Sequence, residues 1–139
     1  MKKRWGVRLG RLFLGGVFAY SGFMKLMEPA ANFQAVLEHY PLLPAWALPF
    51  LAQTVPWAEW IFGMFLVVGY ARRVSALSLG ILSLGFIAAL TGPVMGAGGD
   101  MPEACGCFGE SGLRLSLGQA YLLDWICLAL AGALFRSTR

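Results

Sequence analysis

Four long apolar segments take up most of the chain, at about residues 7–27, 47–70, 74–91 and 117–135. Each is close to the roughly 20 residues that a helix needs to cross the hydrocarbon core of a membrane. Charged residues make up only 13% of the sequence, about half of their share in a typical soluble domain. So few charges cannot cover the surface of a small globule. The sequence therefore predicts a single-domain, all-α integral membrane protein.

The positive charges are sorted among the segments that connect the apolar runs. All of the 11 Lys and Arg residues except Lys25 and Arg114 lie near the N-terminus, in the pair Arg72-Arg73, or at the C-terminus. By the positive-inside rule, both termini and the Arg72 turn are cytoplasmic. This predicts an up-down-up-down four-helix bundle in a bacterial inner membrane, with residues 92–115 facing the periplasm. The net charge of +4 does not indicate nucleic-acid binding, because the charges do not gather on one face.

The first apolar segment begins like a secretory signal peptide, with basic residues before an apolar run. No clear cleavage site closes the run, and further apolar segments follow, so we expect it to remain as the first membrane helix. Gly15, Ala19 and Gly22 are three or four residues apart, which predicts close contact with another helix. Residues 30–40 are short and amphipathic, and they predict an interfacial helix in the first outer loop.

Prolines and glycines mark the second and third apolar segments. Pro49 and Pro56 lie in the first part of the second segment, so we expect that helix to start with a kink or in two pieces. Gly80 and Gly85 each lie four residues from an alanine in the third segment, which predicts close packing at both glycines.

Cys105 and Cys107 are one residue apart in the glycine-rich outer loop. A disulfide between them would close a very small ring, which is strained and therefore easily reduced, and Gly106 relaxes the backbone between them. So short a loop also adds little loop-closure stability. The spacing favours redox exchange, while a structural disulfide and a metal site remain alternatives. Cys127 lies near the middle of the fourth segment and is expected to be a small core residue.

Lys25, Glu59 and Asp124 are ionisable residues in or beside the predicted spans, at one depth in the outer half. Charges at such depth normally face the bundle interior and pair with one another. Two interpretations remain open. The residues form a structural ion pair, most simply Lys25 with Glu59, or they form a polar site for proton handling or for a quinone head group beneath the cysteine loop.

Several short motifs, in order along nearly the whole chain, resemble the MauE family of methylamine-utilisation membrane proteins, which is similar to the wider DoxX-like tetraspan group. The motifs are Gly22-Phe23-Met24-Lys25-Leu26, Tyr40-Pro41-Leu42-Leu43-Pro44, Pro56-Trp57-Ala58-Glu59, Gly63, Gly69 and Cys105-Gly106-Cys107-Phe108-Gly109. The last motif is the specific one, and the others are shared more widely.

The resemblance implies a four-helix membrane protein linked to periplasmic disulfide formation. We therefore expect a thiol–disulfide redox protein in which Cys105 and Cys107 exchange disulfides with a cysteine-containing periplasmic protein or a separate thioredoxin-like protein, in contact with membrane lipid and with a membrane quinone as the candidate cofactor. The alternatives are a carrier for a soft metal or a thiol-reactive solute, and a non-catalytic membrane partner subunit.

Overall fold

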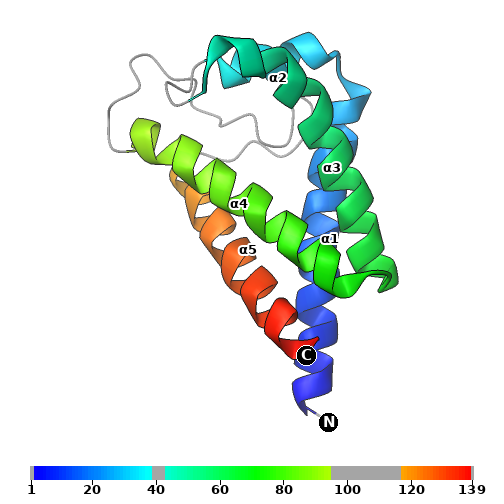
Figure 1. The fold of residues 1–139 in the computed structure, drawn as a ribbon. Helices are drawn as coiled ribbons and strands as arrows, with labels where there is room; N and C mark the ends of the chain where they lie inside the picture. Colours follow the sequence, from blue (N-terminus) through cyan, green and yellow to red (C-terminus); the bar gives the residue numbers. More distant parts are fainter. Residues whose placement is uncertain (1, 39–42, 95–116, 139) are drawn as a thin grey trace.

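The computed structural model describes residues 2–38, 43–94 and 117–138, and these residues form helices and no strands (Figure 1). The elements are α1 (Lys2–Met27), α2 (Ala30–Leu37), the 3-10 helix η1 (Ala45–Ala47), α3 (Leu48–Val68), α4 (Arg72–Val94) and α5 (Leu117–Ser137). The all-α prediction is therefore confirmed for this part of the chain. Both chain termini lie at one end of the bundle, and α2 lies at the other end.

The long helices form two closely packed pairs. Helix α1 packs along α3, and α4 packs along α5, with fewer contacts joining the two pairs through α3–α4 and α1–α5. Two clusters of buried apolar residues fill the interior. One contains Leu14, Leu66 and Leu79, and the other contains Phe33 and Leu90.

The predicted small-residue stripe brings α1 and α3 together. A Cβ atom on Gly22 would lie 2.5 Å from the backbone nitrogen of Trp60, and one on Gly63 would lie 2.5 Å from the backbone nitrogen of Ala19. Real Cβ atoms are not found so close to backbone atoms, so only glycine permits this approach. The close contact predicted for Gly15, Ala19 and Gly22 is confirmed, and its partner is Gly63 with the backbone around it.

The prediction for α4 holds at one glycine and is wrong at the other. A Cβ on Gly80 would lie 3.3 Å from the Cβ of Ala131, which places Gly80 at the contact with α5. No atom of the described residues lies within 4 Å of a Cβ built on Gly85. Gly85 instead lines an apolar pocket between α2, α3 and α4, so its small size leaves space that no neighbouring helix fills.

The ends of α3 follow from its prolines and from a glycine. Helix α3 has Pro49 in its first turn, where a missing backbone N–H costs least, and η1 precedes it as a separate piece. The two-piece start that the prolines predicted is therefore present. Pro56 lies inside the helix. Gly69 ends α3 in the left-handed region at φ 92°, and Ala71 follows at φ 44° before α4 begins.

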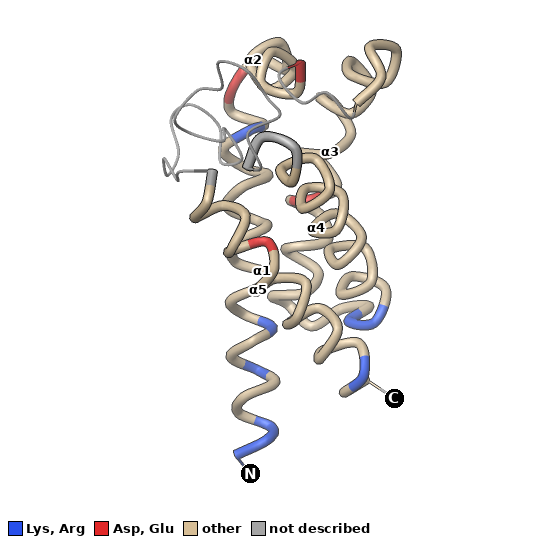
Figure 2. The backbone as a smooth tube through the Cα atoms, turned by 90° about the vertical axis from the view of Figure 1, so that its left-hand side faces the viewer, with Lys and Arg blue, Asp and Glu red and all other residues tan. Residues whose placement is uncertain are grey.

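Three segments in the described part of the chain are long and apolar enough to cross a membrane, namely Ala45–Val68, Arg72–Thr91 and Gly118–Ser137. Helix α1 does not meet this criterion, because basic residues recur through its first three turns and Lys25 lies near its end. It also begins at Lys2, before the predicted start of the first span. Figure 2 shows that the described Lys and Arg residues, except one near α2, gather at the end that carries both termini, whereas the described acidic residues lie nearer the other end.

Candidate functional site

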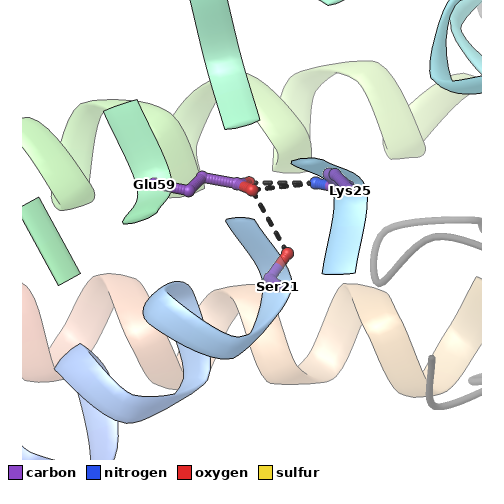
Figure 3. A network of polar contacts seen from close by, with 3 residues as sticks. All are labelled: Ser21, Lys25 and Glu59. Atoms are coloured by element: carbon purple, nitrogen blue, oxygen red, sulfur yellow. Dashed lines mark hydrogen bonds and ion pairs between the residues drawn. The ribbon is translucent and has the colours of Figure 1, made fainter. Parts of the chain in front are cut away.

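A buried ion pair joins α1 to α3 (Figure 3). Its lysine, Lys25, lies in the last turn of α1, away from the N-terminus. The Lys25 Nζ atom lies 3.0 Å from both Glu59 Oε1 and Glu59 Oε2, and it donates to both. The Ser21 hydroxyl donates to Glu59 Oε2 at 3.2 Å. Both charged side chains are fully buried. The pairing of Lys25 with Glu59, one of the two interpretations of these residues, is therefore present in the structure.

The glycine contact between α1 and α3 sets the position of this pair. Ser21 and Lys25 are one helical turn apart on α1, so both face the same side. A Cβ on Gly22 would lie 3.0 Å from the Glu59 Cβ atom. The helices therefore approach closely beside Glu59, which lets one short serine and one extended lysine reach the same acid.

Two aromatic rings enclose the Lys25 ammonium group. Its nitrogen lies 4.5 Å from the ring centroid of Phe33 on α2 and 5.0 Å from that of Phe86 on α4. A cation over an aromatic face is attracted to the ring, and more strongly where water is excluded. Lys25 thus connects α1 to α2, α3 and α4 through one side chain. Ser21, Phe33 and Phe86 were not predicted from the sequence to belong to this site. For Ser21, its position one helical turn before Lys25 was the available indication.

Asp124 lies across a small cavity from the ion pair. The cavity has a volume of about 20 Å³, and Ser21, Glu59, Asp124 and Cys127 contribute to its lining. A space of this size holds about one water molecule, and its polar lining could bind one. The structure therefore brings two of the three predicted intramembrane charges into contact and the third to the edge of the same cavity. Cys127 is a buried free thiol in the core, as its position in the sequence predicted.

The apolar pocket lined by Gly85 bears on the quinone hypothesis. It has a volume of about 260 Å³, and its walls are apolar residues of α2, α3 and α4 together with Leu43. Such a pocket fits an isoprenoid or acyl chain, but its lining side chains offer no hydrogen-bond donor to a quinone carbonyl. The cavity beside Glu59 is too small for a quinone ring. Among the described residues, neither of these two cavities therefore supplies both the space and the hydrogen-bond donors that a quinone head group needs.

Cys105 and Cys107 lie outside the described residues, in the link between Val94, the last residue of α4, and Leu117, the first residue of α5. These two helix ends lie at the end of the bundle away from the termini, as α2 does (Figure 1). The hydroxyl oxygens of Thr91 and Tyr121 are 3.5 Å apart, so the helices that flank the link meet there. No group of three His, Cys, Asp or Glu residues that could hold a metal occurs among the described residues.

Comparison with known families gives one match. The family model described as methylamine utilisation protein MauE matches residues 3–137. The chain belongs to the MauE family. The matched region includes the ion pair, the helices on both sides of it and the Cys-Gly-Cys link. Family membership and the three apolar helices together identify the chain as a membrane protein. Searches among curated proteins and among solved structures give no match.

Proposed function

We propose that this MauE-family protein is a membrane thiol–disulfide redox protein in which Cys105 and Cys107 exchange a disulfide with a separate partner protein. The observation that carries the proposal is the Cys-Gly-Cys spacing within the region that the family model matches. A disulfide in so small a ring is readily reduced and contributes little stability, so exchange explains the spacing better than a structural bond does. The family's name suggests that the partner acts in methylamine utilisation.

The proposed topology has four membrane helices, with α1 as the first span. The gathering of Lys and Arg at the end that carries both termini (Figure 2) supports a cytoplasmic location for that end under the positive-inside rule. The link between α4 and α5 would then face the periplasm of a bacterium, where disulfides persist. Packing along α3, which is itself apolar enough to span, supports a membrane position for α1 as well.

The exchange reaction needs no further cofactor, because the partner's dithiol supplies the two electrons that the disulfide accepts. A thiolate of the partner attacks one sulfur of the Cys105–Cys107 disulfide, that bond breaks, and the released thiolate takes up a proton. The partner's second thiolate then attacks the mixed disulfide. Two electrons pass from the partner's dithiol to the cysteine pair, which becomes a dithiol while the partner becomes a disulfide. The reverse sequence would reduce the partner.

The buried Lys25–Glu59 pair is proposed as the polar part of the same site. It lies in the half of the bundle from which the cysteine link emerges, and Glu59 shares its small cavity with Asp124. A carboxylate beside a cavity large enough for one water molecule can accept and release a proton, which thiol–disulfide exchange requires. The neighbouring apolar pocket is proposed only as a place for an isoprenoid or acyl chain.

Trapping of mixed disulfides tests the proposal directly. Cys107→Ser leaves Cys105 able to form a mixed disulfide that its neighbour cannot resolve, so a covalent adduct should accumulate and be identifiable by mass spectrometry after non-reducing electrophoresis. The double variant Cys105→Ser/Cys107→Ser should give no adduct. Cys127→Ser should change nothing, because that thiol is buried in the core.

Each alternative function predicts a different outcome. A soft-metal carrier should bind copper or zinc tightly through the cysteine pair, form no adduct with another protein, and lose the metal in the serine variants. A non-catalytic partner subunit should support methylamine-dependent growth equally well with both cysteines replaced. Either result would refute disulfide exchange by this pair.

A further inference from the structure

A basic cleft opens at the end of the bundle that carries both termini, far from the ion pair and the cysteine link. It has a volume of about 850 Å³, and its lining consists of Lys3, Arg4, Val7, Arg8, Arg11, Arg72 and Ser137. The lining therefore combines the start of α1, the first residue of α4 and the last residue of α5. The described residues of this lining include five cationic side chains and no acidic one.

Among the described residues, no ion pair neutralises the charges that line this cleft. Arg4, Arg8 and Arg11 follow one another at spacings of four and three on α1, where like charges repel. Neither α1 nor α4 has an acidic residue in its first turn. Arg72 is also the first residue of α4, where the helix dipole adds further positive potential. The buried Nε atom of Arg11 has no hydrogen-bond partner among the described residues.

The depth of the cleft indicates what kind of anion it binds. Arg72 is the first residue of one apolar span, and Ser137 is the last residue of another. The cleft thus lies where two membrane-spanning segments meet the polar region, which is the level of lipid head groups. Leu9 and Leu12, which follow Arg8 and Arg11 directly in the sequence, are exposed, and they could contact acyl chains that extend from a head group.

We propose that this cleft binds the phosphate of an anionic phospholipid of the cytoplasmic leaflet. Arg8 and Arg72, from two helices, would hold the phosphate oxygens between them, and Arg11, which also lines the cleft, would add a third guanidinium group. Guanidinium groups suit this role because their N–H groups match the geometry of phosphate oxygens. The lipid would relieve the repulsion along α1 and connect α1 to α4 and α5, which contact it less extensively than α3 does.

The test compares two double variants that remove equal charge from the same end of the molecule. Arg8→Gln/Arg72→Gln removes two exposed cations that line the cleft. Lys2→Gln/Arg136→Gln removes two exposed cations at the same end of the bundle that do not line the cleft. Binding of phosphatidylglycerol to the purified full chain is measured by native mass spectrometry, with phosphatidylcholine and inorganic phosphate as comparison ligands. The single variant Arg8→Gln serves if the double variant is not obtained.

The proposal expects phosphatidylglycerol to bind the unaltered chain more tightly than phosphatidylcholine does. The cleft variant should lose about 100-fold in affinity, because it removes two side chains that donate hydrogen bonds directly to the charged phosphate. The control, which removes the same charge without removing a direct contact, should keep most of the affinity. Equal losses in both variants would mean general attraction to positive charge and would overturn the proposal. Displacement of phosphatidylglycerol by equimolar inorganic phosphate would identify a free-anion site instead and would also overturn it.

Discussion

At the scale of single residues, burial of the Lys25–Glu59 pair carries a large desolvation cost. Removing two charges from water costs several kcal/mol per ion, and their attraction offsets this only when geometry and further hydrogen bonds are favourable. Here both carboxylate oxygens accept from Lys25, Ser21 adds a second donor, and two aromatic rings face the ammonium group. The pair is therefore well compensated in place and sensitive to the loss of either partner.

Glu59→Gln should destabilise the protein by about 3–5 kcal/mol, because it leaves the Lys25 ammonium buried without its counter-charge. Lys25→Met/Glu59→Gln should be less destabilising than Glu59→Gln alone. Titration with SDS in mixed micelles measures the free energy of unfolding of the double variant and of the single variants Lys25→Met and Glu59→Gln. Glu38→Gln is the matched control at an exposed acid. A double variant as unstable as the sum of its single variants would contradict a direct interaction.

The same variants separate a structural role from a functional one. If the proposed polar site handles protons, Glu59→Gln protein that inserts and accumulates should still exchange disulfides more slowly than the unaltered chain at equal amounts. Full exchange activity in Glu59→Gln, Lys25→Met and Asp124→Asn alike would limit this cluster to a structural role.

At the scale of helices, glycine determines which pairs pack closely. Gly22 and Gly63 let the backbones of α1 and α3 meet, whereas Gly16 on the neighbouring face of α1 has nothing within 4 Å of a built Cβ. In a membrane, close van der Waals packing of this kind contributes much of the attraction between helices, because lipid supplies no hydrophobic drive.

Gly22→Ala should therefore destabilise the protein by about 1–3 kcal/mol, since the new methyl group meets backbone atoms that cannot move aside easily. Gly16→Ala should be neutral or slightly stabilising, because alanine favours helix more than glycine does. The midpoint of thermal unfolding in detergent compares the two. Similar effects from both substitutions would show that the α1–α3 contact is looser than described.

At the scale of the whole molecule, the separation of charges between the two ends governs orientation. The proposal places Ser137 in the cytoplasm and Gly98, in the link after α4, outside. In a background with Cys105, Cys107 and Cys127 replaced by serine, a single cysteine at Gly98 should react with a membrane-impermeant thiol reagent added to spheroplasts. One at Ser137 should react only after lysis. The opposite labelling pattern would invert the topology and remove the cysteine pair from the periplasm.

Much of the fold could be predicted from local sequence patterns. The positions of the long helices follow from apolar runs of suitable length, the α1 stripe from the spacing of its small residues, and the two-piece start of α3 from Pro49. These signals are properties of a single helix or turn, so no knowledge of the partner is needed to interpret them. Membership in the MauE family was likewise predictable, because its motifs lie in order along the chain.

The partners of each helix were decided only by the tertiary structure. The positions of Lys25, Glu59 and Asp124 in the predicted spans placed them at one depth. The packing of α1 on α3 made Glu59 the partner of Lys25 and left Asp124 across a small cavity from the pair. Spacing alone gave Gly80 and Gly85 the same role, yet only Gly80 faces α5. The basic cleft likewise needs three helix ends to converge. Sequence spacing determines which residues share a face, whereas the rotation and neighbours of each helix depend on how all the faces pack together.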